Sequence, residues 1–189
     1  MKLIRLAGVT AYRLHMPKWA VAPTSGAGAA KHGGRANRPG VEALYLALDT
    51  ETAVREYQQV SSLLPPGTLT SYQLTVEPVA DFTAGYDASV WPPIWEDFYC
   101  DWRALWFNQR IEPPSWIVGD TVIAAGSKGI LFPSQARAGG TNLVLFVDAL
   151  TLLCAHETTF FQAHSARNVT TAPTTAATAA TFAKKLSCL

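Results

Sequence analysis

Short apolar segments with the two-residue period of β-strands recur along most of this 189-residue chain, and few segments show helical spacing. The pattern predicts strands at residues 3–15, 41–48, 68–77, 129–134 and 141–146. Helices are expected at 50–63, in the aromatic stretch 91–110, and after Asp120 as a possible cap. The segments do not alternate as βαβ units, and no GxGxxG motif is present. This order favours an α+β fold, a compact single domain with mixed or antiparallel sheets and flanking helices.

Composition narrows the classes of function. Charged residues make up only 15% of the chain, apolar residues make up 49%, and the formal net charge is +1. A near-neutral chain lacks the basic surface typical of proteins that bind nucleic acid directly. The low charge density fits a surface covered by a partner and, equally, an ordinary soluble domain. No apolar run approaches the roughly 20 residues that cross a bilayer, and the N-terminal segment lacks a signal-peptide pattern.

The cysteines and histidines show no metal-ligand spacing. Cys100, Cys154 and Cys188 form no CxxC pair, so neither a zinc site nor a disulfide framework is expected, and a reducing cytoplasm fits best. The four histidines, at positions 15, 32, 156 and 164, are expected to be structural or exposed. From about residue 165 the chain is rich in Thr and Ala, which predicts a poorly ordered tail or a weak helix packed on something else.

One carboxylate has an unusual position on the predicted helix 50–63, which Asp49 or Thr50 can cap. Glu56 lies three residues after Ala53 and therefore on the flank of the apolar stripe of that helix. A carboxylate turned partly toward the interior needs a cation or hydrogen-bond donors. A solvated Glu56 paired with a basic neighbour is the simpler alternative.

Arg35 stands between two glycines and the turn sequence Asn-Arg-Pro-Gly. The Gly/Ala/Pro-rich segment 20–34 precedes it, and loops of this length commonly cover a site or are disordered. With Arg13 on the first strand, Arg35 could hold a phosphate or diphosphate through planar bidentate hydrogen bonds. Ser134 precedes a Gly-Gly turn whose backbone N–H groups can face an anion. Taken singly, Arg35 could also be a surface residue, and Ser134 a turn residue or a helix cap.

The aromatic residues are assigned to packing. Within 91–110 the apolar side chains at helical intervals are Trp91, Trp95, Phe98, Trp102, Leu105 and Trp106. Tyr45, in an apolar strand, is ordinarily a core residue whose hydroxyl finds a partner. Carboxylates at positions 81, 87, 96 and 97 keep a glycosidase-like acidic pair open by number alone.

Together these segments resemble the RES domain, a family named for a recurring arginine, glutamate and serine. The matching motifs are "AYRLH" with Arg13, "GGRANRPG" with Arg35, "ALYLA" with Tyr45, "AVREY" with Glu56, "GTLTSYQLTV", and "GILFPSQARAGGTNLVLF" with Ser134. They span about residues 8–147, so we expect a catalytic domain at 1–150 and a divergent C-terminal extension at 151–189. The resemblance implies a fold similar to that of ADP-ribosyltransferase toxins.

Members of this family are toxins of bacterial type II toxin–antitoxin pairs that act on NAD+ as substrate, and no metal is expected. The resemblance implies cleavage of the nicotinamide–ribose bond, with ADP-ribose passed to water, to phosphate or to a protein such as phosphoribosyl pyrophosphate synthetase. It implies catalytic roles for Arg35, Glu56 and Ser134, and substrate-binding roles for Arg13, Tyr45 and Asn142. Tyr45 could stack on the nicotinamide or hydrogen-bond to it. The expected partner is a helix-turn-helix antitoxin that covers the active cleft in a hetero-oligomer and supplies any contact with DNA.

The chain departs from the family pattern at two places. Many relatives have an aromatic residue where this chain has Ala36, which we expect to alter the cleft wall without removing the anchor. After Phe146 the sequence does not resemble the usual final strand, so the family gives no role for the extension. Two other classes stand as alternatives. One is a catalytically inactive, antitoxin-binding regulator, and the other is a nuclease toxin, which the neutral charge disfavours.

Overall fold

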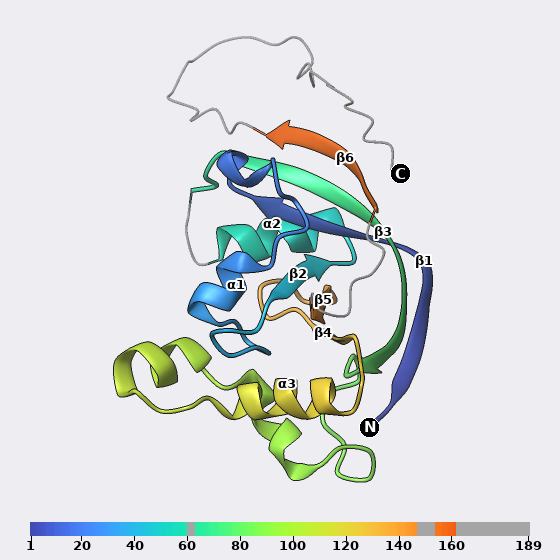
Figure 1. The fold of residues 1–189 in the computed structure, drawn as a ribbon, viewed down its shortest axis with the longest axis vertical. Coiled ribbons are helices and arrows are strands. Elements are labelled where there is room, and N and C mark those ends of the chain that lie inside the picture. The colour runs from blue at the N-terminus through green and yellow to red at the C-terminus, as the bar shows by residue number, and fades with distance from the viewer. Residues whose placement is uncertain (60–62, 147–153, 162–189) are drawn as a thin grey trace.

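Six strands form one mixed sheet within residues 1–59, 63–146 and 154–161, the ranges that the computed structural model describes. They are β1 (Leu3–His15), β2 (Ala43–Ala47), β3 (Gly67–Asp81), β4 (Gly129–Pro133), β5 (Thr141–Phe146) and β6 (Cys154–Phe161), in the spatial order β1-β2-β5-β4-β3-β6. β1 also pairs with β3, so the first five strands close a ring, and β6 lies along β3 outside it (Figure 1). Every pair is antiparallel except β3–β4. The predicted α+β class with a mixed sheet is confirmed.

The ring has an apolar interior and a second apolar layer outside it. All five strands contribute to the interior cluster, whose buried members are Leu6, Ala11, Leu44, Leu46, Tyr72, Leu74, Val76, Val79, Leu131, Leu143 and Leu145. Their sequence neighbours, such as Ala43, Ile130 and Val144, belong to the outer cluster instead. Because β2, β4 and β5 are buried on both faces, they appear in the sequence as nearly continuous apolar runs.

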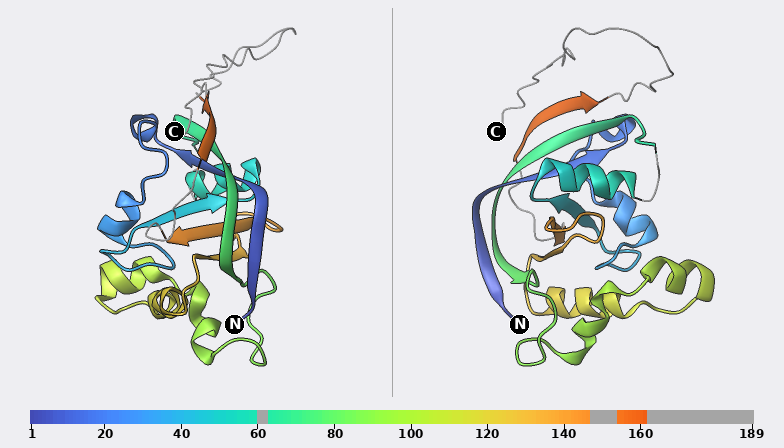
Figure 2. Two further views of the ribbon diagram at one scale, coloured as in Figure 1. Left: turned by 45° about the vertical axis from the view of Figure 1, so that its right-hand side comes forward. Right: turned by 180° about the vertical axis from the view of Figure 1, so that it is seen from behind.

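The outer layer is largely aromatic. The 3-10 helix η2 (Pro93–Tyr99) and the helix α3 (Pro114–Ala124) supply much of it, and they lie at the opposite end of the molecule from β6 (Figures 1 and 2). Trp95 and Phe98 are buried there against Phe82, with ring centroids 4.8 and 5.4 Å from that of Phe82. Core packing is therefore confirmed for Trp91, Trp95, Phe98 and Trp102, whereas Leu105 and Trp106 are only partly buried.

Two helix predictions are wrong in detail. The stretch 91–110 is not one helix, because Cys100 is extended (ψ 154°) between η2 and the π-helical turn η3 (Ala104–Gln109). Asp120 does not cap a helix but lies inside α3, which begins at Pro114. Proline suits the first helical position, since its φ is already helical and the N–H that it lacks would have no partner there. The first error thus arises at the extended Cys100, and the second arises because Pro114, rather than an acidic cap, marks the beginning of a helix.

The helix α2 (Thr50–Gln58) begins as expected. Asp49 caps it through both carboxylate oxygens, which accept from the backbone N of Thr52 at 2.8 Å and from its hydroxyl at 2.7 Å. The helix ends earlier than predicted, and Gln59 has a positive φ of 52°. Residues 60–62 of the predicted helix lie outside the described residues. The cap and the first two turns place Glu56 on the side of α2 that faces the sheet residues described below.

The segment between β1 and β2 holds two short helices, η1 (Pro17–Trp19) and α1 (Ala27–His32). The segment 20–34 was predicted to be a loop that covers a site or is disordered, and six of its fifteen residues instead form α1. The predicted domain boundary at 150 and the predicted tail from 165 lie outside the described residues. In the part of the chain that the structure describes, no helix is long and apolar enough to cross a membrane.

Candidate active site

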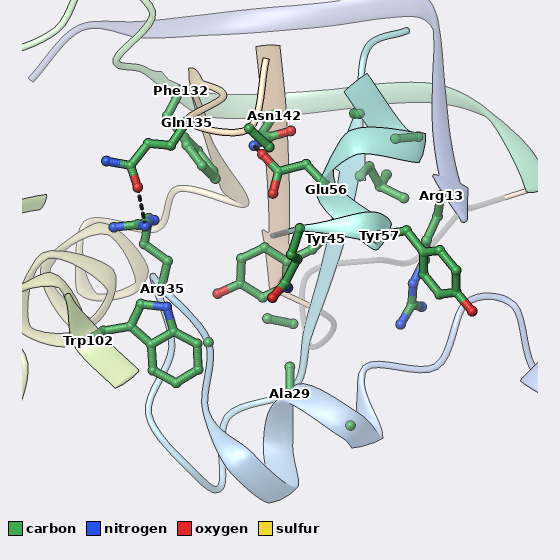
Figure 3. A pocket seen from close by; sticks show the side chains of 18 of the residues that line it. Arg13, Ala29, Arg35, Tyr45, Glu56, Tyr57, Trp102, Phe132, Gln135 and Asn142 are labelled. Atoms are coloured by element: carbon green, nitrogen blue, oxygen red, sulfur yellow. Dashed lines mark hydrogen bonds between the residues drawn. The ribbon is translucent and has the colours of Figure 1, made fainter. Parts of the chain in front are cut away.

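A cleft of about 890 Å³ lies on the side of the ring that carries the aromatic layer. Its floor comes from β2, β4 and β5, and the residues that form it include Ala43, Tyr45, Ala47, Phe132 and Asn142. Its walls come from β1, α1, α2 and residues 99–107 (Figure 3). Five of the six site residues predicted from the sequence line this cleft: Arg13, Arg35, Tyr45, Glu56 and Asn142. The sixth, Ser134, reaches the cleft through a hydrogen bond to Glu56.

Glu56 is held by hydrogen-bond donors rather than by a cation. Its Oε1 accepts from the hydroxyl of Ser134 at 2.7 Å and from the side-chain amide of Asn142 at 2.5 Å. Among the described residues, its other oxygen, Oε2, accepts no hydrogen bond and no cation forms an ion pair with the carboxylate. The alternative of a surface glutamate paired with a basic neighbour is therefore not what the structure shows. One carboxylate oxygen is thus fixed by the protein, and the other is not.

Ser134 acts both as a turn residue and as a partner of Glu56. Its hydroxyl oxygen accepts from the backbone N of Ala136 and of Arg137, each at 3.1 Å, while the hydroxyl donates to Glu56. Asn142, on β5, pairs with Ala47 of β2, and its side chain is 8% exposed. The Oδ1 of Asn142 is buried and has no hydrogen-bond partner among the described residues. Both donors to Glu56 are thus fixed by the β4–β5 hairpin.

Arg35 is fixed by the loop that carries it and by the aromatic segment opposite. Its Nη1 donates to the backbone carbonyls of Phe98 and Cys100, each at 3.2 Å, and its Nη2 donates to Oε1 of Gln135 at 2.6 Å. Burial lowers the pKa of Arg35, while the neighbouring thiol of Cys100, two tyrosines and Glu56 act in the opposite direction. A guanidinium bound only to neutral acceptors keeps its full charge available for an anion.

The glycines before Arg35 are required by close packing. A Cβ on Gly34 would lie 2.4 Å from the hydroxyl oxygen of Tyr45, and Gly33 combines a positive φ of 76° with a Cβ position 2.8 Å from Trp116. The indole N–H of Trp116 donates to the carbonyl of Gly34 at 2.7 Å. These contacts hold the loop against β2 and α3, so the backbone on which Arg35 is mounted is rigid.

Tyr45 supports the arginine loop from below. Its hydroxyl donates to Oδ1 of Asn37 at 2.8 Å and accepts from the backbone N of Ala36 at 2.9 Å. Burial raises the pKa of Tyr45, so the hydroxyl stays neutral. Of the two roles expected for Tyr45, hydrogen bonding and stacking, only the second uses a part of the side chain that the protein has not already engaged.

Arg13 lies on the other side of the cleft from Arg35, with Glu56 and Tyr45 between them (Figure 3). Its Nη1 donates to the carbonyls of Pro23 and Ser25, at 3.4 and 3.1 Å. Arg13 therefore also holds the segment that follows β1 through two hydrogen bonds to its backbone.

The cleft residues that sequence reasoning did not assign to the site include Trp102, Arg103 and Gln135. Trp102 was assigned to the core stripe and is indeed only 6% exposed, but it also lines the cleft. With Arg103 included, the lining carries three guanidinium groups and one carboxylate. None of the four carboxylates that left a glycosidase-like pair open belongs to this lining. No group of three or more His, Cys, Asp or Glu residues in the described ranges could hold a metal ion.

Comparisons with known proteins agree with this architecture. The family model of the RES domain matches residues 10–166, and the match continues past Phe146 and past the expected boundary at 150. Seven chains of solved structures match significantly, whereas no curated protein does. One of the structures is that of the M. tuberculosis MbcT–MbcA toxin–antitoxin complex. The chain is 21% identical to it, with a TM-score of 0.60 over 84% of this chain and 86% of that chain. At this identity the likeness concerns the fold.

Proposed function

Because the chain belongs to the RES domain family, as the match over residues 10–166 shows, we propose that it is the toxin of a bacterial toxin–antitoxin pair. As such it is an enzyme that cleaves the nicotinamide–ribose bond of NAD+ in the cytoplasm. ADP-ribose then passes to water, to phosphate or to a target protein, for which phosphoribosyl pyrophosphate synthetase is one candidate. No metal takes part in the reaction.

The observation that carries this proposal is the distribution of charge in the cleft. Arg13, Arg35 and Arg103 line it, none of them forms an ion pair among the described residues, and Glu56 is the single carboxylate of the lining. A dinucleotide presents a diphosphate to such a cleft, and the ribose next to the nicotinamide becomes positively charged as the bond breaks. Guanidinium groups match the first feature and an isolated carboxylate matches the second.

The reaction mainly requires that the protein position the NAD+ and a negative charge next to its ribose. When the bond between ribose C1′ and the nicotinamide nitrogen breaks, the electron pair leaves with nicotinamide, which departs neutral, and positive charge develops on the ribose. The free Oε2 of Glu56 can stabilise that charge, while Ser134 and Asn142 hold Oε1 in place. The acceptor oxygen then bonds to C1′ and releases its proton to solvent. Tyr45 offers its ring to the departing base.

The partner that we propose is an antitoxin that covers this cleft. One solved structure with this fold is a toxin–antitoxin complex, and the cleft lining includes the exposed side chain of Phe107. An antitoxin seated there would block access to Arg35 and Glu56. On this proposal any contact with DNA belongs to the antitoxin, through a helix-turn-helix part, and the near-neutral net charge of the toxin, +1, fits that division.

The test is mass spectrometry of NAD+ incubated with the purified full-length chain, with and without phosphate and cell lysate. Free ADP-ribose indicates hydrolysis, ADP-ribose 1″-phosphate indicates phosphorolysis, and a mass increase on a protein indicates transfer. Glu56→Gln keeps an oxygen for Ser134 and Asn142 and removes only the charge, so we expect turnover to fall by about 10²-fold or more. Glu51→Gln, an exposed change on the same helix, is the control. An unaltered NAD+ pool with the wild type, or full activity of Glu56→Gln, would contradict the proposal, and the first result would favour an inactive antitoxin-binding regulator.

A further inference from the structure

We propose that Arg103 is a substrate-binding residue that grips the diphosphate of the dinucleotide together with Arg35. The inference rests on the proposed function and deepens it. It identifies the guanidinium that binds the diphosphate together with Arg35 as one from the cleft wall formed by residues 99–107. From the sequence, Arg13 was the expected partner of Arg35. The geometry points instead to Arg103.

The first observation is that Arg103 has unused hydrogen-bonding capacity. Arg13 and Arg35 both donate to backbone carbonyls, and Arg35 also donates to Gln135. Arg103 lines the same cleft, yet within the described residues its guanidinium donates no hydrogen bond and forms no ion pair. Outside the cleft, Arg38 and Arg137 are each paired with carboxylates. All five N–H groups of Arg103 are therefore available to an anion in the cleft.

The second observation is that Arg103 is oriented by a neighbouring ring. Its guanidinium carbon lies 4.5 Å from the centroid of the Trp102 ring. Trp102 is itself buried, at 6% exposure, so the surface beneath the guanidinium is fixed. Stacking leaves the hydrogen-bonding edge of a guanidinium free, and it reduces the conformational entropy that is lost when an anion binds. The positive charge of Arg103 also acts on Tyr45, whose ring forms part of the cleft floor.

The third observation connects Arg103 to Arg35. The carbonyl of Cys100 accepts from Nη1 of Arg35 at 3.2 Å and from the backbone N of Trp102 at 2.9 Å. The backbone next to Arg103 is thus bonded to the same carbonyl as the Arg35 guanidinium. Trp102 lies on the same side of the cleft as Arg35 in Figure 3, and Arg13 lies on the other side. Two guanidiniums on one wall can contact opposite edges of a single diphosphate.

The experiment measures binding separately from turnover. Binding of ADP-ribose by calorimetry to the full chain needs no bond cleavage, and steady-state kinetics with NAD+ gives KM and kcat. For Arg103→Ala we expect the Kd for ADP-ribose and the KM for NAD+ to rise by about tenfold or more, with kcat changed much less. Arg103→Lys keeps the charge but not the planar fork, so its Kd should lie between those of the wild type and Arg103→Ala. The control is Arg55→Ala, an exposed residue of α2 outside the cleft lining.

The outcomes separate this inference from the proposed function. If Arg103→Ala keeps the melting temperature but loses affinity for ADP-ribose, while Arg55→Ala keeps both, Arg103 binds the ligand. If the wild type consumes NAD+ and Arg103→Ala has an unchanged Kd and KM, the role of Arg103 is refuted and the proposed function is not. If the wild type binds no ADP-ribose and consumes no NAD+, both fail.

Discussion

Replacing Gly34 by alanine is the smallest change that should disturb both the stability of the protein and the position of Arg35. The added Cβ would lie 2.4 Å from the hydroxyl oxygen of Tyr45 and 2.6 Å from Oδ1 of Asn37. Neither atom is the free end of a flexible side chain, because the two are hydrogen-bonded to each other and Asn37 is only 1% exposed. Its amide donates to three backbone carbonyls of the surrounding loop. The loop must therefore move as a unit.

The cost can be estimated from the contacts that would be lost. The hydroxyl of Tyr45 makes two hydrogen bonds, to Asn37 and from Ala36, each worth about 1 kcal/mol net. Overpacking of a well-packed site adds about 1–3 kcal/mol. We expect Gly34→Ala to lower the free energy of unfolding by roughly 3 kcal/mol, and the melting temperature by roughly 6–12 °C for a chain of this size. NAD+ turnover should fall as well, because Arg35 is the next residue.

Thermal unfolding followed by circular dichroism checks this estimate. Gly28→Ala is the matched control for stability, since a Cβ at Gly28 meets nothing within 4 Å and the residue lies in α1. Tyr45→Phe alone leaves the backbone N of Ala36 unsatisfied, but in combination with Gly34→Ala it removes the shortest contact. The double variant should therefore lose less stability than the sum of the single variants. Equal melting temperatures for Gly34→Ala and Gly28→Ala would refute the reasoning.

Two further changes test the electrostatics of the protein. Gln135→Glu puts a carboxylate where the amide oxygen now accepts from Arg35 at 2.6 Å. The new charge competes with the substrate diphosphate, so the KM for NAD+ should rise by about tenfold, while Gln135→Ala should show no rise. An unchanged KM for Gln135→Glu would argue against an anion at Arg35. Burial lowers the pKa of His15 below its ordinary 6.5, although the bond to the carbonyl of Met16 opposes this effect. The unfolded chain then binds the extra proton more readily, so the contribution of His15 to stability is complete above pH 6.5 and declines as the pH falls below it. Urea unfolding at about pH 7.5 and about pH 5.5 should show a smaller loss for His15→Gln than for the wild type, and an equal loss would count against the lowered pKa.

The part of the site that could be predicted from the sequence has local signals. Asp49 marks the start of α2, and helical spacing then puts Glu56 at the edge of the buried stripe, where the structure finds it. The paired glycines before Arg35 single out this arginine in the sequence, and the structure adds the reason for the second glycine, its close contact with Tyr45. These features depend on residues a few positions apart, so spacing alone reveals them.

The part that could not be predicted depends on contacts distant in sequence. Helical spacing in 91–110 placed Trp102 in the core together with Trp95, and gave Arg103 no role. The extended residue Cys100 breaks that pattern, and its carbonyl is bonded to an arginine 65 positions earlier. Gln135 likewise approaches Arg35 only because β4 and β5 form a hairpin beside the arginine loop. No local pattern distinguishes such residues from ordinary surface residues.

The ring of five strands has one short pairing, between β1 and β2. β1 and β3 pair along most of their lengths, whereas β1 and β2 meet only at Tyr12 and Ala47, both of which border the cleft. Local opening of the ring should therefore begin at the β1–β2 pairing, and amide hydrogens there should exchange with solvent before those of the longer strand pairs. A dinucleotide that reaches from Arg13 on β1 to Tyr45 on β2 would contact both strands and so connect them where they pair least. Occupation of the cleft would then tighten the scaffold that forms it.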